Sequence, residues 1–297
     1  MSLLGFALLG CAEDPNTPAD NGVGGNASST TNQTNTGAGS SDSTGSSSGG
    51  SNPAASTEKF SFFVTSYKAI AELAGTEDGF GGDLRYGETG DGSGLRGADK
   101  ICTEIAERSM AKNGKTWRAF LSTSVVDAID RVGEGPWYDR RGRVFAMTKA
   151  DLLATRPIGA DQAIINDFPN EDGVTNHAPN GSQVDNHDMI TGSGIDGKLY
   201  RDNPVCTCSD WTSSAFDNTK KPRVGHSWPR SGGGGRTGSP STSGNVEGMS
   251  HWISALDESG CGAGVNIDPL NDTAPGRDGA IGSGGGYGGF YCFALTP

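Results

Sequence analysis

The alternation of apolar and polar residues predicts a strand where the foldable part of the chain begins. Phe60, Phe62 and Val64 fall on one face of residues 59–65. An irregular loop rich in Gly and Asp follows, as far as Gly92. We therefore expect the chain to enter a sheet here and then to leave regular structure for about 25 residues.

Apolar residues recur at helical spacing over residues 97–110 and predict a helix, which the pair Asn113-Gly114 would end. The apolar stripe of this helix consists of Ala98, Ile101, Cys102, Ile105 and Ala106. Strands are predicted over residues 116–121 and 290–295, and Ser124 is placed to cap a short helix over residues 125–132.

Two long stretches, residues 159–197 and 218–246, show little periodicity and are rich in polar residues and Gly. Long stretches of this kind are typical of structured loops that carry a binding surface on a rigid scaffold. We expect the ligand-binding part of the domain to lie in these loops.

The first 57 residues have a different composition. Residues 12–57 are mostly Asn, Thr, Ser, Gly and Pro, with hardly an apolar side chain after Val23. Such a segment buries too little apolar area to offset about 1–2 kcal/mol per residue of backbone ordering. We expect a disordered linker over residues 11–57, with a reach of about 35–40 Å, and one folded domain over residues 58–297.

The start of the chain resembles a bacterial lipoprotein signal peptide over residues 1–10. Leu8-Leu9-Gly10-Cys11 is similar to a lipobox, which implies that Cys11 is lipidated and becomes the first residue of the mature chain. The apolar run is short and no Lys or Arg precedes it, so we expect the natural start to lie upstream. The alternative is an ordinary apolar N-terminus with an incidental cysteine.

The formal net charge of −12 limits the choice of partners. An acidic surface repels nucleic acid and anionic lipid headgroups, so we expect neither as a ligand. Contact with the membrane is expected through the lipid anchor only.

Five further cysteines predict disulfides, because exported proteins form them. From position we pair Cys102 with Cys292, a bridge that closes most of the domain and contributes about 5 kcal/mol in the chain-entropy model, and Cys208 with Cys261. Cys206 is left over: it is free, replaces Cys208, or forms an intermolecular bond. Zinc ligation by Cys206-Thr207-Cys208 is not expected, since only one residue separates the thiols.

Six segments occur in an order that resembles one family, namely GADKIC, KTWRAFLS, GPWYD, HDMITGS, CSDWTS and GFYCF. They are similar, over residues 60–294, to the endostatin-like domains of bacterial outer-membrane lipoproteins, including those of pathogenic spirochaetes. The resemblance implies an α+β, C-type-lectin-like domain with long irregular loops, terminal strands that meet and two nested disulfides. It also implies an adhesin that captures extracellular-matrix or plasma proteins.

Calcium-dependent lectins of this fold use a Glu-Pro-Asn or Gln-Pro-Asp tripeptide, whereas this chain has Phe168 before Pro169-Asn170. Sugar binding through that motif is therefore not expected. An oxygen-rich stretch could still hold Ca²⁺, although a solvated polar loop is the alternative, and we commit to no metal. The candidate ligand-binding residues are Asn170, Asp172, Asn176, Asp185, Asn186, Asp188 and Trp211.

Catalytic residues are not expected. His187 and Asp188 are adjacent in sequence, which predicts that their side chains point apart, and no Gly-x-Ser-x-Gly elbow is present. The alternatives are a structural envelope lipoprotein without a ligand and an enzyme of the formylglycine-generating type on a related fold. The core is the default position for Trp137, Trp211, Trp228 and Trp252.

These patterns together predict a lipoprotein of the bacterial envelope, anchored in the outer membrane and facing the surface or the periplasm. Its domain would bind an extracellular protein or glycan. We expect a monomer unless Cys206 pairs between chains.

Overall fold

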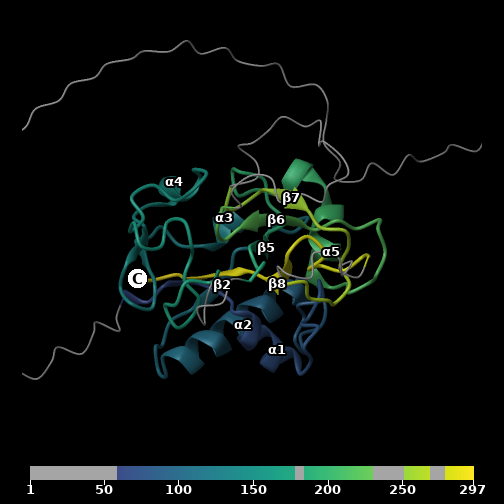
Figure 1. Ribbon diagram of the computed structural model, residues 1–297, viewed down its shortest axis with the longest axis horizontal. Coiled ribbons are helices and arrows are strands. Elements are labelled where there is room, and N and C mark those ends of the chain that lie inside the picture. The colour runs from purple at the N-terminus through teal and green to yellow at the C-terminus, as the bar shows by residue number, and fades with distance from the viewer. Residues whose placement is uncertain (1–58, 178–183, 230–250, 268–277) are drawn as a thin grey trace, which may run out of the picture. The chain divides into compact units, whose positions relative to one another are not determined.

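The structure is a computed structural model that describes residues 59–177, 184–229, 251–267 and 278–297, which belong to one compact unit (Figure 1). The predicted signal peptide, Cys11 and the predicted linker lie outside the described residues. Within the described residues, no helix is both long enough and apolar enough to cross a membrane.

Short helices and strands are distributed along the whole of the described chain. The helices are α1 (Tyr67–Ala74), α2 (Ser93–Ser109), α3 (Ala128–Arg131), α4 (Lys149–Leu152) and α5 (Cys208–Trp211), with 3₁₀ turns η2 (Tyr200–Asp202) and η3 (Pro204–Thr207). The strands are β1 (Phe62–Val64), β2 (Trp117–Ala119), β3 (Trp137–Tyr138), β4 (Val144–Ala146), β5 (Asp188–Ile190), β6 (Arg223–His226), β7 (Leu256–Asp257), β8 (Gly286–Gly289) and β9 (Tyr291–Ala294).

The strands of the described residues form three small sheets, which confirms a mixed α+β architecture. In the first, β9 is the central strand and pairs antiparallel with β1 and β2, so the first and last strands meet as expected. The second is the pair β3–β4. The third has the order β7-β6-β5-β8, in which β5 runs antiparallel to β6 and parallel to β8.

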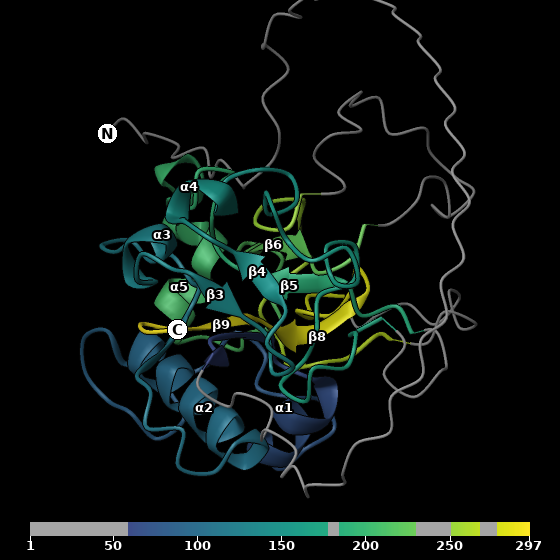
Figure 2. The ribbon, with the colours of Figure 1, turned by 90° about the vertical axis from the view of Figure 1, so that its left-hand side faces the viewer.

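The sequence predicted an irregular loop after residue 65, but Tyr67–Ala74 form α1, so the prediction is wrong for these residues. Ser66 caps this helix, since its side chain accepts a hydrogen bond of 3.1 Å from the Ala69 amide, and Gly75 ends it with φ of +70°. The helices α1 and α2 lie next to each other, on the same side of β8 and β9 in both views (Figures 1 and 2).

Helix α2 begins at Ser93, four residues before the predicted start, and all five residues of its predicted apolar stripe are buried. Its backbone packs unusually close to neighbouring chain. A Cβ atom on Gly97 would lie 2.0 Å from the carbonyl oxygen of Leu84, and one on Gly94 would lie 2.2 Å from that of Asp210. Only glycine at these two positions permits this approach.

The predicted cap at Ser124 is also wrong. Helix α3 begins after Asp127, whereas the amide and hydroxyl of Ser124 both donate hydrogen bonds to the Asp210 carboxylate. The Asp210 carboxylate therefore binds both donors of Ser124, which lies four residues before the first residue of α3.

The core is aromatic. Phe62 packs between Phe145 and Phe293, and Trp252 contacts Phe145 and Tyr291 edge-on. The core position predicted for tryptophan is confirmed for Trp137, Trp211 and Trp252, which are fully buried. It is wrong for Trp228, which is only half-buried.

Both predicted disulfides are confirmed: Cys102–Cys292 joins α2 to β9, and Cys208–Cys261 is nested inside it. Cys206 is buried and is not a free thiol. It does not replace Cys208 either, because Cys208 is already bonded to Cys261.

The segment Cys208–Trp211 is a left-handed turn in which four consecutive non-glycine residues have φ between 50° and 63°. Such backbone costs about 1–2 kcal/mol per residue, so surrounding contacts must hold it. Thr207 accepts a hydrogen bond from the Asp210 amide, and the Trp211 indole donates one of 2.8 Å to the Ser122 carbonyl. The disulfide at Cys208 secures the other end of the turn.

Candidate functional site

The candidate ligand-binding residues at the start of the oxygen-rich stretch have structural roles. The Asn170 side chain accepts hydrogen bonds from the amides of Asp172 and Val174 and so closes a turn. The buried Glu171 carboxylate accepts hydrogen bonds from the amide and hydroxyl of Ser66. Asp172 is exposed.

Trp211 is likewise a structural residue. Its side chain is fully buried, and its indole N–H is satisfied by the Ser122 carbonyl. The prediction that Trp211 takes part in ligand binding is therefore wrong. The left-handed turn that carries it directs the indole into the core, where the ring lies against Gly192.

The structure brings Asn176 and Asn186 together. The Asn186 amide donates a hydrogen bond of 2.6 Å to the Asn176 carbonyl, and the Asn176 amide contacts the hydroxyl of the buried Tyr287. The Asn186 side-chain oxygen in turn accepts a hydrogen bond of 2.9 Å from the Trp228 indole N–H. These contacts fix the orientation of the indole.

Trp228 forms a stack with His177, in which the ring centroids lie 3.9 Å apart and the planes differ by 19°. Both rings are half-buried. We call this pair the aromatic stack. On its inner side, the Trp228 ring lies 4.9 Å from that of His187, which is fully buried.

A cluster of buried histidine and acidic side chains adjoins the aromatic stack. Asp188 Oδ1 lies 3.0 Å from His226 Nε2 and 3.3 Å from His187 Nε2, and all three side chains are fully buried. His187 Nδ1 lies 2.6 Å from Asp185 Oδ1 on the opposite side of the imidazole ring. One carboxylate oxygen thus faces two imidazole nitrogens.

The prediction that His187 and Asp188 point apart is wrong. Side chains alternate between faces only within a strand, and β5 begins at Asp188, so His187 is not bound by that alternation. The pairing of β5 with β8 also shifts register at Asp188, and the Asp188 amide donates to the Gly285 carbonyl. This irregularity brings the two side chains together.

Glu258 completes the cluster. Its Oε2 accepts hydrogen bonds from the Ser283 hydroxyl at 2.6 Å and from the Gly284 amide at 2.9 Å. A Cβ atom on Gly284 would lie 2.9 Å from Asp188 Oδ2 and 3.1 Å from Glu258 Oε1. The glycine-rich segment before β8 therefore lies directly against both carboxyl groups, as only a residue without a side chain can.

The two carboxyl groups of Asp188 and Glu258 lie beside each other, and each shifts the pKa of the other. Burial and the neighbouring Asp188 charge raise the pKa of Glu258 well above its usual range. Burial also disfavours ionisation of Asp188, but His187 and His226 outweigh it and lower the pKa of Asp188. Since two carboxylates repel each other, their contact requires a shared proton or a cation.

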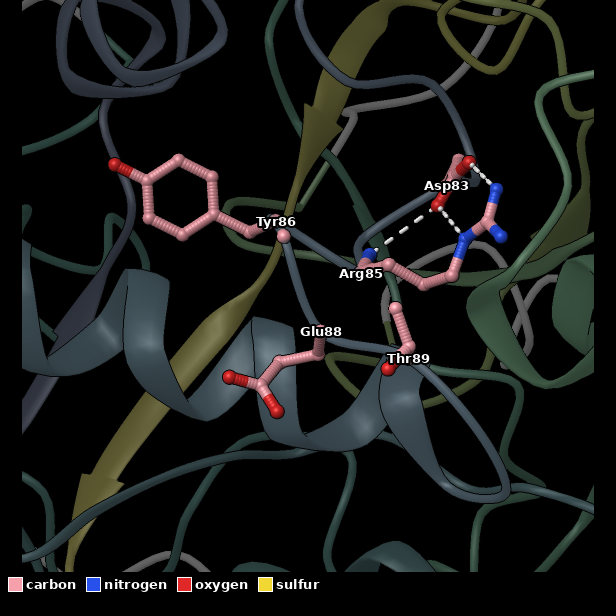
Figure 3. A pocket seen from close by; sticks show the side chains of 6 residues that line it. Asp83, Arg85, Tyr86, Glu88 and Thr89 are labelled. Carbon is pink, nitrogen blue, oxygen red and sulfur yellow. Dashed lines mark hydrogen bonds and ion pairs between the residues drawn. The ribbon is translucent and has the colours of Figure 1, made fainter.

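The surface also contains a depression of about 320 Å³ beside residues 83–89 (Figure 3). Its charged groups are paired with nearby groups: Arg85 binds the Asp83 carboxylate, and Glu88 pairs with Arg96. Figure 3 shows the Arg85 and Tyr86 side chains on opposite sides of the segment. The depression therefore offers a ligand little unpaired polar surface.

Known proteins add nothing to this geometry. No model of a protein family matches the chain, and a search of the curated proteins finds no match.

Five residues of this region were not predicted as site residues from sequence, namely His177, His187, His226, Trp228 and Glu258. Their segments show no periodicity from which a site could be predicted. The one available signal was composition: His226 and Trp228 lie two residues apart in a chain with only four histidines.

Proposed function

We propose that this chain is an exported, non-catalytic surface lipoprotein whose C-type-lectin-like domain binds an extracellular protein or glycan through the aromatic stack of His177 and Trp228. The observation that carries the proposal is the half-buried stack itself. Burial of the other tryptophans in the core is the common outcome, whereas an aromatic side chain left at the surface among polar loops is typical of a binding face.

The fixed orientation of Trp228 supports this function. Its indole N–H is bound by Asn186, and Asn186 is bound in turn to Asn176. A ring that is already ordered loses little conformational entropy when a ligand binds, which favours affinity. The polar groups beside the stack are suited to hydrogen bonds with hydroxyl groups of a sugar or with a peptide backbone.

Export is supported by the two disulfides of the domain, which persist in oxidising compartments. Attachment through Cys11 follows from the resemblance of residues 8–11 to a lipobox. Metabolic labelling with a fatty acid tests this attachment: we expect incorporation into the wild-type chain and none into Cys11→Ser.

The binding function is tested by applying the purified chain to a glycan array and to a panel of immobilised extracellular-matrix glycoproteins. Truncation of a central aromatic contact costs about 2 kcal/mol or more, or about 30-fold in affinity, and we expect this loss for Trp228→Ala. His177→Ala should weaken binding to the same ligand.

Val125→Ala is the matched surface control. Val125 is 84% exposed, and its backbone and neighbours contact Thr123 rather than the aromatic stack. Unchanged affinity of Trp228→Ala for a ligand that the wild type binds would show that the stack is not the binding face. A chain that binds nothing on either panel would favour a purely structural envelope protein.

A further inference from the structure

The ligand geometry of a metal ion is already present in the buried cluster. His187 Nε2, Asp188 Oδ1 and His226 Nε2 all lie within 4.8 Å of one another, and the two nitrogens are 3.3 Å and 3.0 Å from the shared oxygen. Four ligands at about 2.0–2.1 Å from a tetrahedral ion are separated by about 3.3 Å. The two nitrogen–oxygen distances are therefore close to the edge length of a coordination tetrahedron.

The imidazole of His187 is oriented as metal-binding imidazoles are. Asp185 Oδ1 contacts its Nδ1 at 2.6 Å. A carboxylate at Nδ1 favours the proton on that nitrogen, so that Nε2, on the side of Asp188, is the nitrogen suited to bind a metal. A carboxylate behind the imidazole is a recurrent outer-shell contact in metal sites.

No Lys or Arg among the described residues balances the acidic groups of the cluster. Asp188 and Glu258 are both fully buried, and within the described residues neither pairs with a Lys or Arg. Arg156, which lies near, donates instead to the carbonyl oxygens of His226 and Ser227. Two buried carboxyl groups need a positive charge close by if both are to ionise.

Glu258 lies beside Asp188 at the edge of the cluster. Its Oε2 is held by Ser283 and Gly284, whereas Oε1, like Asp188 Oδ2, receives no hydrogen bond from any other described residue. Each carboxyl group therefore directs one oxygen into the cluster. The glycine-rich segment before β8 lies against these oxygens and closes the site with backbone.

We propose that His187, Asp188 and His226 bind one Zn²⁺ ion, with the Glu258 carboxyl group beside Asp188. Two imidazole nitrogens with a carboxylate oxygen suit zinc, whereas Ca²⁺ requires six to eight oxygen ligands. All three ligands are fully buried, which separates the ion from bulk solvent. The ion connects β5 with β6, and it fixes His187 against Trp228.

The first test uses the full chain. It is stripped of metal with a chelator and titrated with ZnCl₂ by calorimetry, with native mass spectrometry to count bound ions. We expect one ion per chain and a raised melting temperature. X-ray absorption of the zinc-loaded wild type should show scattering from two imidazole rings, a readout that needs no variant to fold.

Variants locate the site. His226→Gln should weaken zinc binding by at least about 100-fold, and Asp185→Asn and Glu258→Gln, which alter only outer contacts of His187 and Asp188, by about 10–100-fold. His251→Asn is the matched control: it changes a buried histidine whose Nδ1 accepts a hydrogen bond from the Ile253 amide, and it should leave the affinity unchanged.

Absence of stoichiometric zinc uptake by the stripped wild type would overturn the proposal and leave a buried network that shares protons. Uptake that persists in His226→Gln, or absorption spectra without imidazole scattering, would place the ion elsewhere and overturn it as well. The result is independent of the ligand-binding test, because zinc can bind whether or not the aromatic stack recognises a glycan or a protein.

Discussion

Asp188 and His226 are direct partners across the antiparallel strands β5 and β6, and the Oδ1 atom of Asp188 lies 3.0 Å from Nε2 of His226. The strand register alone brings them together. A slip of one residue would turn one side chain to the opposite face of the sheet. The buried cluster therefore depends on the same hydrogen bonds that hold the sheet.

The close approach of α2 to the Leu84 segment predicts a large penalty for Gly97→Ala. Alanine favours an isolated helix over glycine by about 1 kcal/mol, but its Cβ would lie 2.0 Å from a backbone oxygen. We expect a net loss of about 3 kcal/mol or more in the free energy of unfolding, since backbone must move. Urea denaturation measures it, with the exposed helical residue in Lys100→Ala as control. Equal stability of the two variants would contradict the packing.

Removal of the outer disulfide is expected to cost more than removal of the inner one. Cys102–Cys292 spans 190 residues and Cys208–Cys261 spans 53, which gives about 5 and about 4 kcal/mol in the chain-entropy model. Paired Cys→Ala replacements, compared by guanidinium denaturation, test the order. A larger loss for the inner pair would show that the disulfide holds the left-handed turn at Cys208 as well as closing a loop.

Because the pKa of His251 is lowered in the folded protein, we expect the protein to lose stability in mild acid. Burial, with the charges of Arg156 and Arg223, lowers its pKa from 6.5 to about 4 in the folded protein. The unfolded chain therefore binds the proton first, and stability falls as the pH drops from about 6.5 to about 4, by as much as about 3 kcal/mol. Thermal unfolding of the wild type and His251→Asn across this range is the measurement. The asparagine variant should lose that part of the pH dependence, and an unaltered profile would refute the assignment.

For Glu171 we expect the opposite dependence of stability on pH. Burial raises its pKa above the ordinary value, even though hydrogen bonds from Ser66 favour the carboxylate. The folded state then holds the proton more tightly than the unfolded state, so this group lowers stability as the pH rises past about 4.5. Glu171→Gln keeps the shape of the side chain and one acceptor oxygen for the Ser66 amide, and its NH2 group is a donor in place of the protonated carboxyl oxygen.

The glutamine variant should be more stable than the wild type at neutral pH and equal to it in acid. Asp91→Asn, an exposed carboxylate on another segment, is the control and should change neither value. A loss of stability in Glu171→Gln at neutral pH would mean that the carboxylate form is required by Ser66.

The sequence by itself determined the elements whose information is local. The stripe of α2 follows from helical spacing, β9 from a run of apolar residues, and both disulfides from their position in an exported chain. The two ends of α1 could also have been predicted, because Ser66 and Gly75 are typical signals for the start and the end of a helix. The Gly-rich sequence that follows favoured a loop instead.

Only the tertiary structure decided the roles of the polar residues. Asn170 and Asp188 belong to one oxygen-rich stretch, yet one closes a turn and the other faces two histidines. His226 and Glu258 join Asp188 from segments without periodicity, through strand register and a glycine-rich segment that admits no Cβ atom. A sequence pattern reports which face of an element is apolar. It does not report which buried polar groups meet, because that depends on contacts between segments far apart in the chain.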